Sequence, residues 1–150
     1  MVSEKLHSIG ITIKSLHKIN RKTEAIRKAD CIIVGGGNTF YLLKSLQEFK
    51  LLDAVKQRIH DGIPYIGWSA GSNLACPTIR TTNDMPIVEP ANFNALSFIP
   101  FQINPHYTDN IDKMHAGETR EMRIEEFLMA NQNMYVAGLR EGSLFCIEDE

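Results

Sequence analysis

Apolar residues recur along the chain in patterns that predict short strands. Residues 9–16 alternate between apolar and polar side chains, which is typical of a half-buried strand. Residues 31–34 instead form a continuous apolar run, as expected of a parallel strand buried on both faces. Residues 65–66 are interpreted as the end of another buried strand. Further strands are predicted at residues 101–103, 134–139 and 144–147.

Helices are predicted between these strands. Asn38 or Thr39 can cap a helix whose leucines follow at helical spacing, and Asn20 can cap an earlier one. The predicted helices occupy residues 23–28, 39–46, 51–60 and 119–129. Residues 76–104 contain several prolines and predict an extended loop region with brief strands. The alternation of strands and helices predicts an α/β fold, a mainly parallel sheet with helices on both faces.

Composition places the chain among ordinary globular proteins. Its 150 residues, 43% hydrophobic and 23% charged, suffice for a single domain spanning residues 1–150. The formal net charge of −2 gives no electrostatic reason to expect nucleic acid or a membrane surface as partner. No apolar run approaches the ~20 residues of a membrane span. Three isolated cysteines, without a C-x-x-C or H-E-x-x-H motif, indicate a reducing compartment, taken as the cytoplasm, and no metal site.

A G-x-S-x-G pattern follows the predicted strand at residues 65–66. Ser69 lies between Gly67 and Gly71, a spacing that suits a strand-to-helix elbow with an exposed serine hydroxyl. The amide of Ala70 would then face the same space, where an oxyanion needs a donor. The alternative is a tight turn before a helix with no chemical role.

A second glycine cluster, Gly35 to Gly37, follows the predicted strand at residues 31–34. Phe40 occupies the position where a dinucleotide-binding fingerprint requires a third glycine or alanine, and the Gly-Lys-Ser/Thr of a Walker loop is absent. Phosphate binding therefore has weak support. The loop could instead present an amide beside Ser69, or be a purely structural turn.

A serine nucleophile needs a base and a group that orients the base. His106 is the histidine placed at the end of a predicted strand, where sites of parallel sheets form. Glu141 and Asp84 both lie in turns that could bring a carboxylate to it. Each of these residues could equally be a solvated loop side chain.

Several motifs together resemble the peptidase E family of bacterial α-aspartyl dipeptidases, whose wider family includes cyanophycinase. They are V-G-G-G-N-T-F (34–40), G-W-S-A-G-S (67–72), T-T-N-D-M-P (81–86), N-P-H (104–106), G-E-T-R (117–120) and L-R-E-G-S (139–143). The resemblance covers nearly the whole chain in the right order. It implies a serine peptidase on a class I glutamine-amidotransferase-like, flavodoxin-like three-layer fold that needs no cofactor.

The resemblance also implies roles for individual residues. Ser69 would be the nucleophile, His106 the base and Glu141 the third member of the triad, while Asp84 matches a family acid of unassigned role. The oxyanion hole would be formed by the amides of Ala70 and Gly37. The substrate would be a small Asp-X dipeptide. The side-chain carboxylate of its aspartate is expected to bind Arg120, with Arg80 as second choice. Asn38 is expected to be a further substrate-binding residue.

Two alternatives remain open: a cyanophycinase-like or esterase activity on the same framework, and a non-catalytic module for binding or assembly. Members of the family are longer at both ends, so this chain is expected to lack part of the sheet. The strand predicted at residues 9–16 would then expose an unpaired edge. Self-association, most simply as a two-fold dimer, is the expected consequence.

Overall fold

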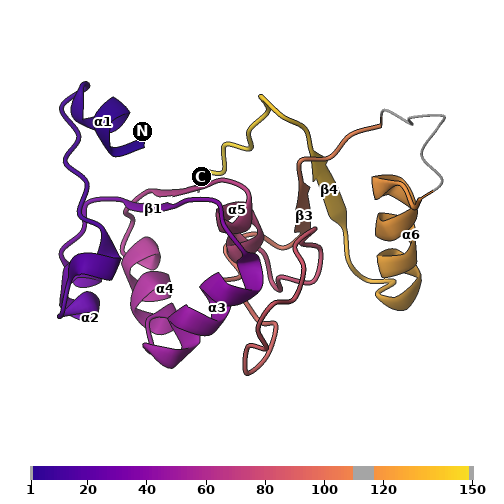
Figure 1. The fold of residues 1–150 in the computed structure, drawn as a ribbon, viewed down its shortest axis with the longest axis horizontal. Coiled ribbons are helices and arrows are strands. Elements are labelled where there is room, and N and C mark those ends of the chain that lie inside the picture. Colours follow the sequence, from indigo (N-terminus) through magenta and orange to yellow (C-terminus); the bar gives the residue numbers. More distant parts are fainter. Residues whose placement is uncertain (1, 110–116, 149–150) are drawn as a thin grey trace.

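A computed structural model describes residues 2–109 and 117–148 of the chain (Figure 1). It begins with helix α1 (Val2–His7), the short 3₁₀ helix η1 (Leu16–Lys18) and helix α2 (Lys22–Arg27). The strand predicted at residues 9–16 is wrong: this segment forms no ladder, and Ile9 is 69% exposed. Alternation alone cannot make a strand, because its amides and carbonyls need a neighbouring strand to pair with.

The first parallel pair consists of β1 (Ile32–Val34) and β2 (Tyr65–Gly67), with Ile33 opposite Ile66. Helices α3 (Thr39–Glu48) and α4 (Leu52–His60) connect the two strands, close to the predicted bounds. The predicted cap of α3 is present, because the Asn38 side chain accepts a hydrogen bond from the Tyr41 amide at 3.1 Å. The cap predicted for α2 is wrong: that helix starts after Arg21 and has no side-chain cap.

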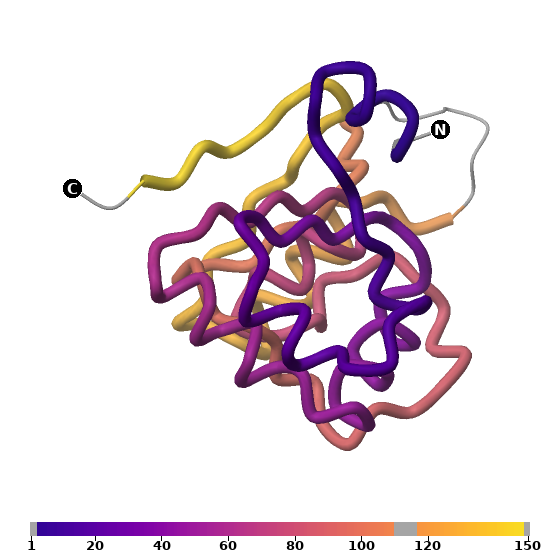
Figure 2. The backbone as a smooth tube through the Cα atoms, turned by 90° about the vertical axis from the view of Figure 1, so that its left-hand side faces the viewer, coloured from indigo at the N-terminus to yellow at the C-terminus, as the bar shows by residue number. Residues whose placement is uncertain are grey.

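The second parallel pair consists of β3 (Gln102–Pro105) and β4 (Val136–Leu139), with Pro105 opposite Leu139. Helix α6 (Arg120–Ala130) precedes β4, and Thr119 caps it by accepting from the Met122 amide at 3.1 Å. No strand forms at residues 144–147, so that prediction is also wrong. Figure 2 shows residues 140–148 projecting from the rest of the molecule. This tail pairs with no strand among the described residues, although the Phe145 ring contacts that of Phe101 at 5.7 Å, and Leu144 is 77% exposed.

Helix α5 (Ala70–Ala75) lies at the centre of the molecule and joins the two strand pairs, since it contacts β1, β2 and β3 as well as α3. Parallel strands flanked by helices confirm the α/β class. The described residues nevertheless form two two-stranded sheets rather than the one sheet predicted. No ladder links β2 to β3; the two pairs are connected through α5.

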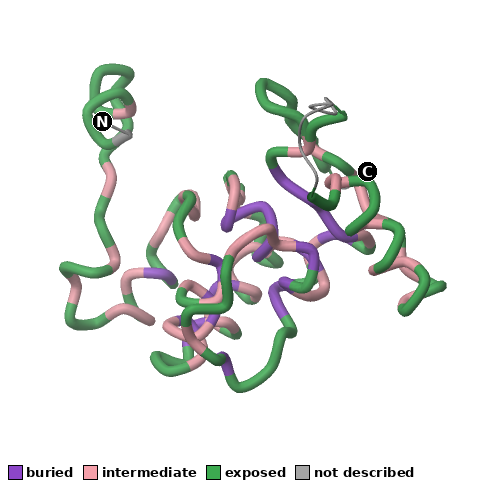
Figure 3. Tube along the Cα trace, turned by 45° about the vertical axis from the view of Figure 1, so that its right-hand side comes forward, coloured by how far each residue is buried: buried purple, intermediate pink, exposed green. Residues whose placement is uncertain are grey.

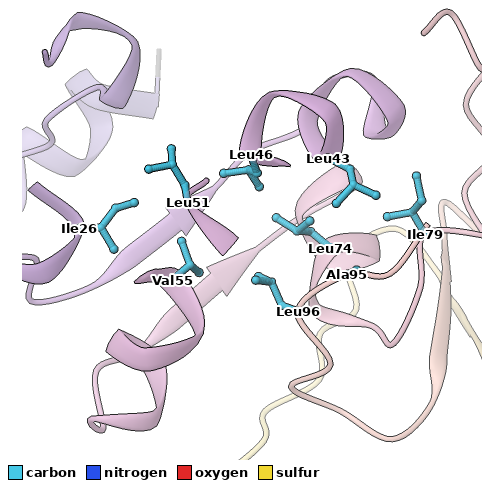
Figure 4. Packing of buried hydrophobic residues seen from close by; sticks show 9 residues of the cluster. All are labelled: Ile26, Leu43, Leu46, Leu51, Val55, Leu74, Ile79, Ala95 and Leu96. Carbon is cyan, nitrogen blue, oxygen red and sulfur yellow. The ribbon is translucent and has the colours of Figure 1, made fainter. Parts of the chain in front are cut away.

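The main hydrophobic core extends from α2 and α4 past α3 to α5 and the loop region after it (Figures 3 and 4). It contains Ile26, Leu43, Leu46, Leu51, Val55, Leu74, Ile79, Ala95 and Leu96. Several of these residues come from the loop region 76–101, which has only an isolated bridge between Thr78 and Asn94. A smaller cluster of Cys76, Ile99 and Ile103 packs at β3. None of the helices within residues 2–109 and 117–148 is both long and apolar enough to cross a membrane.

Candidate active site

Ser69 occupies the turn between β2 and α5, as the elbow pattern predicts. Its backbone has φ 55° and ψ −116°, a conformation that is unfavourable for a residue with a side chain. Steric crowding explains why both flanking positions of the pattern are glycine. A Cβ on Gly71 would lie 2.1 Å from the Val34 carbonyl oxygen, and one on Gly67 would lie 2.7 Å from the Gly71 oxygen. The elbow therefore requires glycine at both positions.

A chain of hydrogen-bonding contacts starts at the Ser69 hydroxyl. Its Oγ lies 2.9 Å from Nε2 of His106, and Nδ1 of His106 contacts Oε1 of Glu141. A neutral imidazole with its proton on Nδ1 would donate to Glu141 and accept from Ser69. The side chains of His106 and Glu141 are 50% and 79% exposed, so the Glu141 end of this series of contacts faces solvent.

Parallel pairing places the imidazole and the carboxylate together. His106 directly follows β3 and Glu141 lies in the turn after β4, and the register sets Pro105 opposite Leu139 at the ends of these strands. The carboxyl ends of parallel strands meet at one edge of a sheet, which is where sites of α/β proteins form. Residues separated widely in the sequence thus become neighbours.

The glycine loop after β1 lies beside Ser69. A Cβ built on Gly36 would be 3.3 Å from the Ser69 Cβ and 3.6 Å from its Oγ. The next residue, Gly37, has φ 143°, and Ala70 is buried at the start of α5. The amides of Gly37 and Ala70 donate to no other residue within the described ranges. Their predicted role as oxyanion donors is compatible with this placement and stays a prediction.

Asp84 does not contact His106. Its Oδ2 accepts hydrogen bonds from the Thr39 amide at 2.7 Å and from the Thr39 hydroxyl at 2.5 Å, at the start of α3. Of the two carboxylates left open by the sequence, the structure therefore brings Glu141 to the imidazole. Asn38 is engaged at the same helix start, donating to the Met85 carbonyl at 2.8 Å while it caps α3. Its substrate-binding role stays a prediction.

Ser69, His106 and Glu141 share an open cavity of about 1310 Å³. Neither predicted arginine lines it. Arg120 begins α6, where burial and the neighbouring Arg123 lower its pKa, and Arg80 packs on the ring of Phe93 at 5.8 Å.

The cavity is instead lined by Arg140, which precedes Glu141 and forms an ion pair of 2.6 Å with Asp109. Sequence reasoning missed this arginine, although its place at the end of a predicted strand was a usable signal. Within the described part of the chain, no cluster of three or more histidine, cysteine or acidic residues could hold a metal ion.

Comparison with known proteins gives matches to a single peptidase family along nearly the whole chain. The model of Peptidase family S51 matches residues 1–150. The chain is 51% identical over 148 residues to Peptidase E of a Nostoc species, covering 99% of this chain and 61% of the relative. It is 54% identical over 141 residues to Peptidase E of Salmonella arizonae, covering 94% and 62%. It thus spans about three fifths of the length of these curated relatives.

A similar fold is found in a crystal structure from Listeria monocytogenes EGD-e, described as that of a candidate peptidase E. The TM-score is 0.65 at 28% sequence identity, and the match covers 91% of this chain and 66% of that chain.

Proposed function

The chain belongs to peptidase family S51, and we propose that it is a serine peptidase that hydrolyses dipeptides with an N-terminal aspartate. The observation that carries the proposal is the contact chain from Ser69 through His106 to Glu141. The family membership and the relatives called Peptidase E support peptide hydrolysis. The preference for aspartate rests on the motif resemblance. Because the chain spans only part of its relatives' length, its own activity is a proposal as well.

In the proposed reaction the Ser69 hydroxyl attacks the carbonyl carbon of the peptide bond. His106 Nε2 takes the hydroxyl proton as the new C–O bond forms, and the carbonyl oxygen becomes an oxyanion. The amides of Ala70 and Gly37 would stabilise that charge, each by about 3–4 kcal/mol. The tetrahedral intermediate then breaks the C–N bond, and the imidazolium gives its proton to the leaving amine.

Water completes the cycle in the second half. His106 removes a proton from a water molecule, whose oxygen attacks the carbonyl carbon of the acyl-enzyme ester. The ester C–O bond then breaks, aspartate leaves, and the imidazolium returns its proton to the Ser69 oxygen. Glu141 accepts a hydrogen bond from the Nδ1 proton of His106 and stabilises the imidazolium that forms in both halves of the reaction. Asp84 takes no part in proton transfer in this scheme, because its carboxylate accepts hydrogen bonds from Thr39.

The side-chain carboxylate of the N-terminal aspartate requires a cation. Arginine suits it because the planar guanidinium group binds carboxylates in a bidentate manner. Arg120 is kept as the predicted partner. Arg140 is a further candidate besides Arg80, since it lines the same cavity as Ser69, although its ion pair with Asp109 would have to open to admit the substrate. Arg120→Met and Arg140→Met separate them: the binding arginine, when replaced, raises KM for Asp-X dipeptides and leaves the hydrolysis of simple esters intact.

The remaining expectations belong to the same proposal. They are a glutamine-amidotransferase-like sheet, a single domain, action in the cytoplasm without cofactor or metal, and a two-fold dimer. The dimer was expected from an exposed strand at residues 9–16. That strand is absent, so self-association now rests only on other exposed apolar residues, such as Ile66 of β2, which is 50% exposed.

The test is labelling of the full chain with a fluorophosphonate, combined with turnover of Asp-X dipeptides, Gly-X dipeptides, simple esters and a cyanophycin-like polymer. We expect Ser69 to be labelled and Asp-X dipeptides to be preferred, with Ser69→Ala as the matched control. Turnover of esters or of a cyanophycin-like polymer without Asp-X hydrolysis would favour the first alternative. Absence of both labelling and turnover would favour a non-catalytic module.

A further inference from the structure

His106 is held in an unfavourable backbone conformation. Its φ is 57°, in the left-handed region that residues with a Cβ rarely adopt. Such residues persist only where their surroundings over-determine them. The contacts that hold His106 in place therefore decide where its imidazole points.

The peptide groups on both sides of His106 are fixed. On the preceding side, Asn83 Nδ2 donates to the Pro105 carbonyl oxygen at 2.8 Å. On the following side, the Tyr107 amide donates to the Leu139 carbonyl at 3.0 Å. The Tyr107 ring also packs on Gly138, where a Cβ would come within 2.6 Å of it. Of these contacts, only the one from Asn83 comes from outside the β3–β4 pair.

Asn83 is itself well placed to act as a support. Its Oδ1 accepts a hydrogen bond from Asn104 Nδ2 at 2.9 Å, which fixes the orientation of the amide and aims its nitrogen at Pro105. The next residue, Asp84, is bonded to Thr39 at the start of α3. The segment that carries Asn83 thus connects the start of α3 to strand β3, which ends at Pro105, directly before His106.

We propose that Asn83 is a positioning residue for His106: its amide holds the Pro105 carbonyl so that the imidazole stays between Ser69 and Glu141. Asn83 touches none of the reacting atoms, and its effect on catalysis rests on the proposed function. Its effect on the geometry of His106 does not depend on the proposed function. A misplacement of about 1 Å in a catalytic group can reduce a rate roughly 100-fold.

The neighbouring Thr81 offers a matched control. Its hydroxyl donates to the Ile103 carbonyl at 2.9 Å, so it also ties this segment to β3, but at a position further from His106. The Ile103 carbonyl keeps a second donor, Asn73 Nδ2 at 2.8 Å, when Thr81 is replaced by valine. A role confined to stability predicts similar losses of activity for Thr81→Val and for variants of Asn83.

The key variant is Asn83→Asp, which keeps an acceptor for Asn104 and removes the donor to Pro105. Asn83→Ala is made as well, because it introduces no charge beside Asp84. We expect each to lower kcat for Asp-X dipeptides about 10- to 100-fold, with KM changed less than about threefold, and to slow fluorophosphonate labelling by the same factor. Thr81→Val is expected to stay within about threefold of wild type. Circular dichroism establishes that each variant is compared at a temperature at which it is folded.

A second readout does not depend on activity. In protein with ¹⁵N-labelled histidine, the Nδ1 proton of His106 that is bonded to Glu141 should give a downfield imidazole resonance, assigned by its loss in His106→Gln. We expect both Asn83 variants to weaken or abolish this signal and Thr81→Val to retain it.

The outcomes separate the inference from the proposed function. If wild type shows neither labelling nor turnover, yet the resonance is lost in the Asn83 variants alone, the positioning role stands and the function falls. If wild type is active and the Asn83 variants match Thr81→Val in kcat and in the resonance, the positioning role is refuted and the function stands.

Discussion

The close contact between α5 and β1 makes Gly71→Ala the sharpest test of the elbow. The added Cβ would lie 2.1 Å from the Val34 carbonyl oxygen and 2.9 Å from its carbon, both atoms of the backbone. An ordinary carbon–oxygen contact is about 3.3 Å, so α5 and β1 must separate by roughly 1 Å. Gly71 follows Ser69 by less than one helical turn, and the displacement therefore reaches the nucleophile.

The expected loss follows from this displacement. A misplacement of about 1 Å at a catalytic group costs on the order of 100-fold in rate. Overpacking of this kind destabilises a fold by about 1–3 kcal/mol, which corresponds to a melting temperature lower by roughly 3–10 °C for a chain of this size. Gly71→Ala should therefore remain folded at 20 °C while losing most of its activity.

The assay measures kcat/KM for an Asp-X dipeptide and the rate of Ser69 labelling, with thermal unfolding followed in parallel. Ala95→Val is the control, because it overpacks a core residue that is 1% exposed and lines neither the elbow nor the cavity that contains Ser69. We expect less than a threefold change in the control. Wild-type activity and melting temperature in Gly71→Ala would refute the steric reasoning.

Further measurements address the rest of the site and the fold. Ser69→Ala and His106→Ala should each remove nearly all peptidase activity, and the double variant should lose little more, since the groups act as a unit; additive losses would contradict the shared mechanism. Glu141→Gln should lower kcat by at least about 100-fold, with Asp84→Asn less severe, and the opposite order would make Asp84 the orienting acid. Burial raises the pKa of the Cys76 thiol from 9.0 to about 12. The unfolded thiol ionises near pH 9, so stability from the neutral thiol is complete below pH 9 and is lost as the pH rises to 12. Denaturant titrations should show a steeper alkaline decline for wild type than for Cys76→Ala. Light scattering should report a dimer, and a well-folded monomer would refute self-association.

Local sequence patterns were sufficient for helices α2, α3, α4 and α6 and for the elbow, but they did not predict helix α1. Asn38 before the leucines of α3 predicts the observed cap, because a side-chain oxygen can bond to an amide of the first turn without any tertiary contact. The G-x-S-x-G spacing placed Ser69 between a strand and a helix. The structure adds the reason, which is the direct contact of Gly71 with the Val34 carbonyl.

Patterns failed where pairing between distant segments decides the outcome. Residues 9–16 and 144–147 have strand-like sequences, yet a strand exists only where another strand meets it, and neither segment has such a partner among the described residues. The choice between Glu141 and Asp84 also lay beyond the sequence. Both are acids in turns, and their separation from His106 along the chain carries no information about distance in space.

The sequence by itself determined the family, the order of most elements and the residues with the chemistry for acyl transfer. Only the tertiary structure decided which of them meet. The parallel register of β3 and β4 sets Glu141 beside His106, while the bonds to Thr39 keep Asp84 at the start of α3. The physical reason is that side-chain chemistry and helix capping are local properties of the chain, whereas strand pairing and the meeting of catalytic groups depend on contacts between residues far apart in it.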